Sequence, residues 1–309
     1  MTLNELRYVV AVARERHFGR AAEACYVSQP TLSVAVKKLE DELGMSLFER
    51  GHGDVSITPV GEQVVAQAQR VLEEAGALKQ IARQGQDQLA GPLRLGAIYT
   101  IGPYLLPHLV SILAEQAPRM PLIIEENFTA ALSEKLKQGE VDAILVSMPF
   151  EAPGILVLGL YEEPFVVLMP SAHPLAARDE VSVDDIRREN VLMLGAGHCF
   201  RDQVLQLCPD CGARGRGEAG ATQQTIEGGS LETIRYMVAG GLGITVLPCT
   251  AAGADRFSQR LLAIRRFEGS PPTRRVALAW RKSFPRPKAI EALRRAVLAS
   301  GLSCIRPAG

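Results

Sequence analysis

The sequence predicts an α/β protein in three consecutive parts, and three observations along the chain support this prediction. Residues 1–60 have the spacing of short helices followed by a turn-rich hairpin. Residues 61–90 form one polar stretch, rich in Ala and Gln, with helical periodicity. From residue 91 to residue 309, short apolar strands alternate with amphipathic helices, which is the pattern of an α/β domain with a mostly parallel sheet.

The composition is that of a soluble globular protein. A chain of 309 residues is too long for one ordinary core, so we expect two or three domains. Its 34 basic residues balance 34 acidic ones, so net charge alone does not indicate a nucleic-acid partner. The start lacks the pattern of a signal peptide, and the most apolar stretch, residues 155–170, is too short to cross a bilayer. We therefore expect a cytoplasmic protein with no membrane partner, and reduced cysteines.

Residues 19–43 have the spacing of a helix-turn-helix. A short helix, residues 19–25, precedes a tight turn and a second helix that ends at Gly44. Ser28 or Gln29 can cap the second helix, and Pro30 fits its first turn, where no N–H is needed. Its buried stripe consists of Leu32, Val36, Leu39 and Leu43. The opposite face carries groups that suit DNA base edges and phosphates, namely Gln29, Thr31, Ser33 and Lys37.

Five short motifs in this part resemble the winged helix-turn-helix of LysR-type transcriptional regulators. They are Phe18–Glu23, Val27–Ser33, Lys38–Gly44, Leu47–Arg50 and Ile57–Gly61. The resemblance implies that the second helix enters the major groove of double-stranded promoter DNA and that residues 47–58 form a wing. The implied DNA-binding set is Ser28, Gln29, Pro30, Thr31, Ser33, Lys37 and Arg50. Residues 1–60 hold seven basic and eight acidic side chains, so we expect several such domains to act together.

The stretch 61–90 predicts a long linker helix that ends before Gly91 and Pro92. Its apolar residues form one stripe, which suits a helix that pairs with its own copy and equally a helix that lies on its own domain. The family resemblance favours pairing in this dimerisation helix. It also implies a homo-oligomer, a dimer of dimers, and contact with RNA polymerase.

The third part predicts strands at residues 93–98, 122–126, 141–146 and 191–194. Thr100, Thr129 and Cys199 each follow a strand and precede a helix, which is where open α/β sheets gather ligands. Each threonine taken alone is better explained as a helix cap. Residues 173–175 and 238–248 extend the LysR resemblance to the effector domain. That resemblance implies two lobes, like those of a periplasmic binding protein, with a cleft between them.

The segment Gly197–Cys208 resembles the redox segment of peroxide-responsive LysR-type regulators. The resemblance implies that hydrogen peroxide is the signal, that it oxidises Cys199, and that Cys208 then closes a disulfide. It places five residues around the peroxide: Thr100, Thr129, His198, Arg201 and Asp202. A helix N-terminus at Cys199 would favour the reactive thiolate, and His198 and Arg201 could add positive potential or hydrogen-bond donors. The first product would be a sulfenic acid.

The spacing of the two cysteines predicts a conformational switch. Phe200, Val204 and Leu207 recur at helical spacing, and a helix would separate the Cα atoms of Cys199 and Cys208 by about 13 Å. Since a disulfide needs about 5.5–6 Å, oxidation should unfold this segment. We expect the change to repack the subunit interface and alter the spacing of the DNA-binding domains.

Several alternatives stay open at this point. Cys211 can compete with Cys208 as the resolving thiol, or the CxxC of residues 208–211 can contribute to a zinc site, although no second pair follows. We expect no resident metal or cofactor, packing roles for Cys25 and Cys249, and no role for Cys304. A regulator of the same family can instead sense a small organic effector in the cleft. A thiol peroxidase has no need of the first 90 residues, so we expect stoichiometric chemistry and no enzyme.

Overall fold

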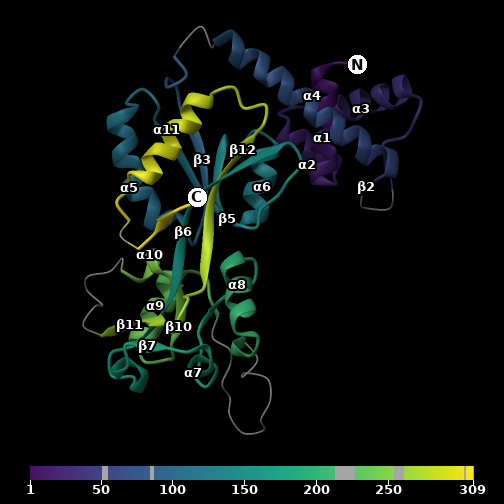
Figure 1. Ribbon diagram of the computed structural model, residues 1–309. Helices are drawn as coiled ribbons and strands as arrows, with labels where there is room; N and C mark the ends of the chain where they lie inside the picture. Colours follow the sequence, from purple (N-terminus) through teal and green to yellow (C-terminus); the bar gives the residue numbers. More distant parts are fainter. Residues whose placement is uncertain (51–54, 84–86, 213–226, 254–260, 303, 309) are drawn as a thin grey trace. The chain divides into compact units, whose positions relative to one another are not determined.

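The computed structural model describes the chain except for residues 51–54, 84–86, 213–226, 254–260, 303 and 309, and except for the side chains of residues 50 and 79–83. The chain divides into two compact units, Met1–Gln86 and Asp87–Gly309. Figure 1 traces both. Among the described residues, no helix is long and apolar enough to cross a membrane.

The first unit is a winged helix-turn-helix followed by a long helix. Its elements are α1 (Leu3–Glu15), α2 (Phe18–Ala24), α3 (Gln29–Leu43), the antiparallel wing strands β1 (Phe48–Arg50) and β2 (Val55–Ile57), and α4 (Pro59–Arg83). Helix α3 begins and ends as predicted, because the Ser28 side chain accepts the N–H of Thr31 and Gly44 adopts a left-handed conformation. Leu32, Val36 and Leu39 are fully buried, whereas Leu43 is half-buried.

The second unit has two lobes, each with its own apolar core. The first lobe contains β3 (Leu93–Ile98), α5 (Gly102–Gln116), β4 (Leu122–Asn127), α6 (Thr129–Lys137), β5 (Ala143–Ser147) and α11 (Pro287–Leu298). The second contains η1 (Pro174–Ala177), β7 (Glu180–Val181), α7 (Val183–Arg187), β8 (Met193–Leu194), α8 (Cys199–Leu207), η2 (Pro209–Gly212), β9 (Glu227–Gly228), α9 (Leu231–Ala239), β10 (Thr245–Pro248), α10 (Cys249–Ala252) and β11 (Leu262–Phe267).

Two long strands connect the lobes, as Figure 1 shows. Strand β6 (Ile155–Pro170) contributes Tyr161 to the first core and Phe165 to the second. Strand β12 (Thr273–Arg281) pairs with the first-lobe half of β6, and the short β13 (Arg306–Pro307) pairs with β6 at Glu162 and Tyr161. The two lobes therefore share a sheet at their junction.

The prediction of a mostly parallel sheet is wrong. Strand β3 is parallel to β4 and β5, but β12 is antiparallel to both β5 and β6, and β10 and β11 are antiparallel to β6. The alternation of strands and helices breaks between β5 and β6 and between β11 and β12, where no helix separates consecutive strands. Parallel pairing needs a crossover connection, so these breaks mark the antiparallel part.

Candidate functional site

Cys199 is the first residue of α8 and lies where the two lobes meet. Its helix belongs to the second lobe, because Phe200 and Val204 are buried in that core. The half-buried Cys199 side chain nevertheless packs against the core of the first lobe. Of the six cysteines, only Cys25 and Cys199 are free thiols. Cys199 is therefore the free thiol of the second unit, and it is placed between two lobes.

A pocket of about 720 Å³ opens beside this thiol. Its lining comes from both lobes: Ser147, Met148, Pro149, Phe165, Cys199, Asp202, Gln203, Gln206, Leu207, Pro272, Thr273, Arg274 and Arg275. Polar and charged side chains make up most of this set. The pocket thus brings a thiol, an acid and amides together, a combination that suits a small polar molecule.

Gln203 fastens α8 to the first lobe. Its Nε2 donates to Ser147 Oγ over 2.9 Å and to the Met148 carbonyl over 3.4 Å, at the end of β5. Its Oε1 is buried and has no hydrogen-bond partner. The sequence reasoning missed this residue, although it lies one helical turn after Cys199 and so on the same helix face.

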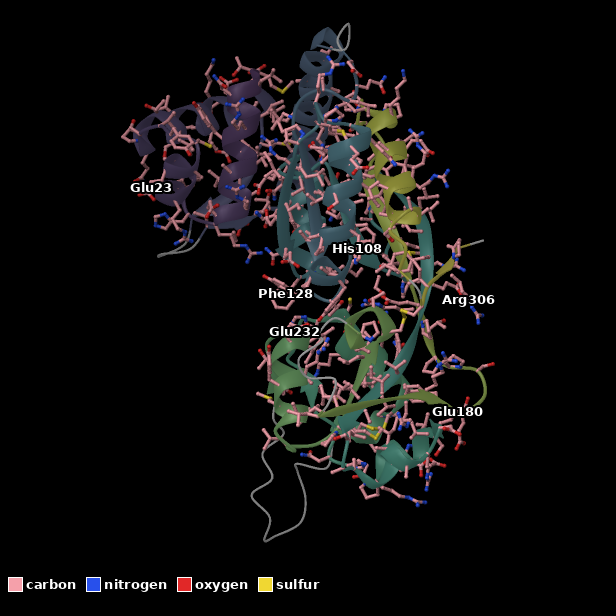
Figure 2. All side chains as sticks on the ribbon, turned by 90° about the vertical axis from the view of Figure 1, so that its left-hand side faces the viewer. Glu23, His108, Phe128, Glu180, Glu232 and Arg306 are labelled. Atoms are coloured by element: carbon pink, nitrogen blue, oxygen red, sulfur yellow. A yellow bond between two sulfur atoms is a disulfide. The ribbon has the colours of Figure 1, made fainter. Side chains whose placement is uncertain are left out.

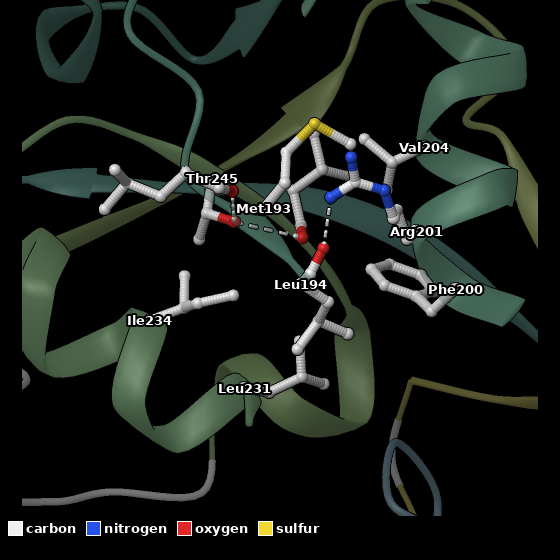
Figure 3. Close-up of a pocket in the computed structure, with 10 residues that line it drawn as sticks. Met193, Leu194, Phe200, Arg201, Val204, Leu231, Ile234 and Thr245 are labelled. Atoms are coloured by element: carbon white, nitrogen blue, oxygen red, sulfur yellow. Dashed lines mark hydrogen bonds between the residues drawn. The ribbon is translucent and has the colours of Figure 1, made fainter. Parts of the chain in front are cut away.

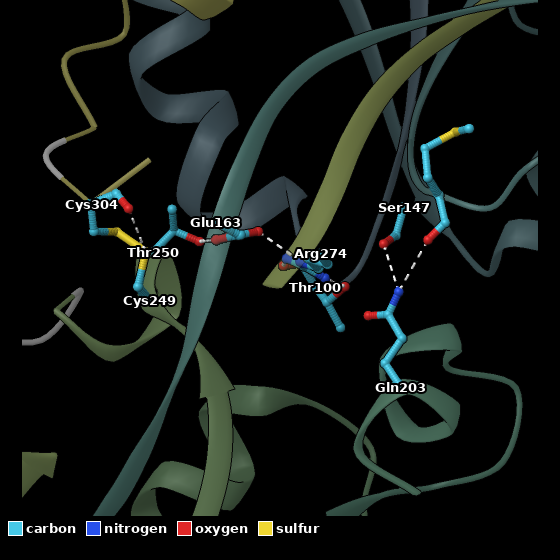
Figure 4. Close-up of polar contacts among 9 residues, drawn as sticks. Thr100, Ser147, Glu163, Gln203, Cys249, Thr250, Arg274 and Cys304 are labelled. Atoms are coloured by element: carbon cyan, nitrogen blue, oxygen red, sulfur yellow. Dashed lines mark hydrogen bonds and ion pairs between the residues drawn. A yellow bond between two sulfur atoms is a disulfide. The ribbon is translucent and has the colours of Figure 1, made fainter. Parts of the chain in front are cut away.

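A fully buried ion pair forms the opposite wall. Arg274 Nε donates to Glu163 Oε1 over 2.7 Å, and both side chains are entirely inaccessible to solvent. The same guanidinium donates to the hydroxyl and the carbonyl of Thr100, each over 2.8 Å, and Thr250 donates to Glu163 Oε2 over 2.6 Å (Figure 4). Charges buried this deeply persist only when every polar atom is paired. The network therefore fixes a buried Arg274–Glu163 ion pair beside the pocket that holds Cys199.

The DNA-facing residues predicted in α3 are mostly exposed. Ser28, Gln29, Pro30, Thr31 and Lys37 are exposed and Ser33 is half-buried. The side chain of Arg50 and the wing tip, residues 51–54, lie outside the described residues.

Two exposed apolar side chains on the same motif were missed by the sequence reasoning. Tyr26, in the turn of the motif, is 96% exposed, and Val34 of α3 is 68% exposed. Large apolar groups left in water on a recognition surface are available for contacts with a partner.

The comparisons decide the family. Residues 3–62 match the bacterial regulatory helix-turn-helix protein family of the LysR type, and residues 86–301 match the LysR substrate binding domain. The chain belongs to the LysR family.

Its similar relatives in that family are OxyR proteins. The chain is 38% identical to the DNA-binding transcriptional dual regulator OxyR of Escherichia coli over 97% of its own length and 95% of that protein. A full-length Pseudomonas aeruginosa OxyR with a cysteine-to-aspartate substitution is 52% identical, with a TM-score of 0.76 and coverage of 99% and 100%. A hydrogen-peroxide-bound Corynebacterium glutamicum OxyR cysteine-to-serine mutant is 34% identical, with a TM-score of 0.62 and coverage of 97% and 92%.

Thr100 and Thr129, predicted to surround the peroxide, are not among the described residues that line the Cys199 pocket, and they differ in role. The alternative that Thr100 is a helix cap is wrong, because the N-cap residue of α5 is Ile101. Thr100 is buried and accepts from Arg274 instead. Thr129 is the first residue of α6, as predicted, and its buried hydroxyl makes no hydrogen bond. One threonine therefore positions a charge, and the other holds an unused donor.

The prediction that His198 adds positive potential is wrong. Its ring is buried and packs edge-on against Phe128 and Tyr99 of the first lobe, with ring centroids 4.8 and 5.9 Å away. Figure 2 shows Phe128 at the side of the first lobe that faces the second. Burial lowers the pKa of His198, and a hydrogen bond to the Gly229 backbone offsets this only in part. The imidazole is therefore neutral near pH 7.

Arg201 is directed into the second lobe. Its Nη1 donates to the Leu194 carbonyl over 2.6 Å and meets Glu227 Oε1 at 2.7 Å, beside a small cavity of about 10 Å³ (Figure 3). Its charge is paired there, so the predicted effect of Arg201 on the thiol is not supported by this placement. Asp202 is exposed and lines the Cys199 pocket.

The expectation that all cysteines are reduced is wrong for this structure. Cys208 is bonded to Cys211, with Cα atoms 5.4 Å apart, and Cys249 is bonded to Cys304, with Cα atoms 6.2 Å apart. The short η2 turn brings the first pair together. This bond removes both thiolates from the zinc alternative, and it means that Cys208 is not a free resolving thiol in this state. Cys304, predicted to have no role, forms a covalent link.

Proposed function

We propose that this LysR-family chain is a transcriptional regulator that binds promoter DNA through α3 and senses hydrogen peroxide through Cys199. The observation that carries the proposal is the free, half-buried Cys199 thiol in a pocket lined by both lobes. The OxyR relatives named as peroxide-responsive regulators support it over most of the chain. Promoter DNA, hydrogen peroxide and further copies of the chain are the partners that this function requires.

The first step is oxidation of the thiolate. The sulfur of Cys199 attacks one oxygen of the peroxide, the O–O bond breaks, and the second oxygen leaves as hydroxide that takes up a proton to form water. The polar side chains that line the pocket with Cys199, among them Gln203 and Thr273, are the groups available to donate to the leaving oxygen. The product is a sulfenic acid on Cys199. We propose stoichiometric sensing, without turnover.

The second step requires α8 to unfold. Cys199 opens the helix and Cys208 follows its end, so their Cα atoms are separated by about 13 Å, far beyond disulfide range. A thiol reductant must first open the Cys208–Cys211 bond. The Cys208 thiol then displaces water from the Cys199 sulfenic acid and forms the new disulfide. Phe200 and Val204 must leave the second core, and Gln203 must release Ser147.

This rearrangement supplies the signal to DNA. We propose that the unfolded segment changes how copies of the second unit pack, within a homotetramer built as a dimer of dimers. The spacing of the α3 helices would change with that packing, and with it the contact to RNA polymerase. A cytoplasmic location fits this function, because reductants there return the sensor to its thiol form.

Non-reducing peptide mapping by mass spectrometry tests the sensor. Fully reduced protein receives a brief pulse of stoichiometric peroxide, in wild type, in Cys199→Ser and in Cys25→Ser as the matched free-cysteine control. We expect a Cys199–Cys208 link in wild type and Cys25→Ser, and none in Cys199→Ser. A link to Cys211 keeps the sensor and changes the resolving thiol. Unmodified Cys199 after the pulse rejects peroxide sensing, and sustained peroxide consumption with excess reductant indicates a peroxidase.

The size of the pocket favours one second candidate, a LysR-type regulator that senses a small organic effector. A volume of about 720 Å³ far exceeds one peroxide molecule and lies within the range of ordinary ligand pockets. Its polar lining, which includes Ser147, Gln206 and Thr273, suits a polar effector. Two results together would select this candidate. A small carboxylate would raise the melting temperature of the protein, and hydrogen peroxide would leave Cys199 unmodified.

A further inference from the structure

We propose that Cys249 and Cys304 are a second redox-active pair whose disulfide ties the two lobes together and tunes the reactivity of Cys199. The inference rests on the proposed peroxide sensor and adds a site to it. The ligand class for this site is a thiol reductant or an oxidised thiol, which exchanges with the disulfide.

The bond joins parts that belong to different lobes. Cys249 is the first residue of α10 and packs against the second core. Cys304 is 55 residues further on, and its neighbours Leu302 and Ile305 pack against the first core. The disulfide is therefore a covalent connection between the lobes in addition to the chain itself.

The segment that carries Cys304 has few other attachments to β6. Strand β13 is only two residues long, and Ala308 donates to the Leu160 carbonyl over 3.0 Å. Figure 2 labels Arg306 of this strand near the lobe junction. Short strands contribute little stability by themselves, so the covalent bond is the strongest attachment of this segment.

The disulfide is linked to the sensor pocket through a short series of contacts, drawn in Figure 4. Thr250 follows Cys249 directly and donates to Glu163 Oε2 over 2.6 Å. Glu163 accepts from Arg274 over 2.7 Å, and Arg274 lines the pocket with Cys199. A bond that holds the start of α10 thus also holds the carboxylate that positions Arg274.

The exposure of the two pairs suggests that they differ in how easily reductants reach them. Cys208 and Cys211 are both buried, whereas Cys249 and Cys304 are both half-buried. Attack by a thiolate needs access to a sulfur.

Two thiols of a reductant transfer two electrons and two protons: the Cys249–Cys304 bond breaks, both residues become thiols, and the reductant becomes a disulfide. Exchange with an oxidised thiol restores the bond.

Opening the pair should slow oxidation of Cys199. Without the bond, α10 and Thr250 shift more freely, so the Glu163–Arg274 pair behind the pocket wall is held less firmly and the pocket around Cys199 is less well ordered. We expect the rate of Cys199 oxidation to fall by about 3- to 10-fold, the range of an indirect coupling.

The test uses full-length Cys211→Ser protein, in which Cys249–Cys304 is the one disulfide left from this structure. Samples poised at graded ratios of reduced to oxidised glutathione are mapped for the Cys249–Cys304 link. Each then receives stoichiometric peroxide, and sulfenic acid on Cys199 is trapped with dimedone over time. The rate should follow the fraction of linked protein. Adding Thr250→Val should slow the oxidation of Cys199 while the Cys249–Cys304 link stays intact. Adding Cys25→Ser should change neither the oxidation rate nor the link.

The outcomes separate the two proposals. A Cys199 that reacts equally fast in linked and unlinked protein overturns the second redox pair and leaves the sensor intact. A Cys249–Cys304 link that never opens across the glutathione series also overturns it. A Cys199 that fails to react in every sample rejects the proposed sensor instead.

Discussion

The two walls of the Cys199 pocket are held in opposite ways. The wall formed by Arg274 is buried, with hydrogen bonds to Glu163 and Thr100 that join strands and loops far apart in the sequence. The wall formed by α8 is a nine-residue helix without a side-chain cap, fastened to the first lobe by Gln203. Helices this short are not stable alone and depend on packing. One wall is thus a rigid, buried ion pair, and the other carries the thiol on an element that can unfold.

Arg274→Leu should produce the largest loss of stability. It leaves Glu163 buried without its partner, so we expect the free energy of unfolding to fall by about 3–5 kcal/mol in chemical denaturation. The matched control is Arg275→Leu at the next residue, whose pair with Glu162 is exposed, with an expected loss of about 0–1 kcal/mol. Equal losses at both positions would contradict the rigid wall.

Cys304→Ser should have the next largest effect. It opens a loop of 55 residues in the unfolded chain, so we expect a loss of about 2–4 kcal/mol under oxidising conditions. Cys211→Ser opens a bond between residues only three apart, so it should cost less. The difference should vanish when both proteins are denatured in excess reductant, and a difference that persists would assign the loss to packing.

Gln203→Ala should have a smaller effect on stability and a visible effect on the switch. It removes the hydrogen bond to Ser147, worth about 1 kcal/mol, and so favours unfolding of α8. Rapid-quench peptide mapping should show faster closure of the Cys199–Cys208 link after Cys199 is oxidised. Gln206→Ala, at an exposed pocket residue on the same helix, is the control. Unchanged closure in Gln203→Ala would show that α8 is held by other contacts.

The smallest effect concerns pH. Burial lowers the pKa of His198 in the folded protein, so below its ordinary value of about 6.5 the unfolded chain binds a proton that the folded chain does not. Stability from this residue is therefore fully present above pH 6.5 and is lost as the pH falls toward the folded pKa. Denaturation of His198→Asn should lack this loss, whereas His108→Asn, at an exposed histidine, should retain it.

Local chemistry made part of this fold predictable. The limits of α3 follow from Ser28, Pro30 and Gly44, and the sequence also predicted a helix N-terminus at Cys199. The mixed sheet was not predicted, because periodicity reveals strands but not which strands pair. The antiparallel half depends on β6 meeting β10, β11 and β12, whose pairing partners lie far away in the sequence.

The site was predicted less completely, for the same reason. Glu163 and Arg274 are 111 residues apart, and neither belongs to a local motif, so only the fold reveals their pairing. His198 and Arg201 were expected to carry charge to the thiol because they are close to it in sequence. The structure buries the ring of one and pairs the other with Glu227. Closeness to Cys199 in the sequence did not predict which way the side chains of His198 and Arg201 point in the fold.

We propose that peroxide unfolds α8 while the Arg274 wall stays in place. Hydrogen exchange of the reduced full-length protein, before and after stoichiometric peroxide, tests it most directly. We predict that peptides covering residues 200–207 lose protection once Cys199 is linked to Cys208, whereas those covering β12, residues 273–281, keep theirs. If α8 keeps its protection in protein with the Cys199–Cys208 link, the disulfide forms without unfolding the helix and the proposed switch is wrong.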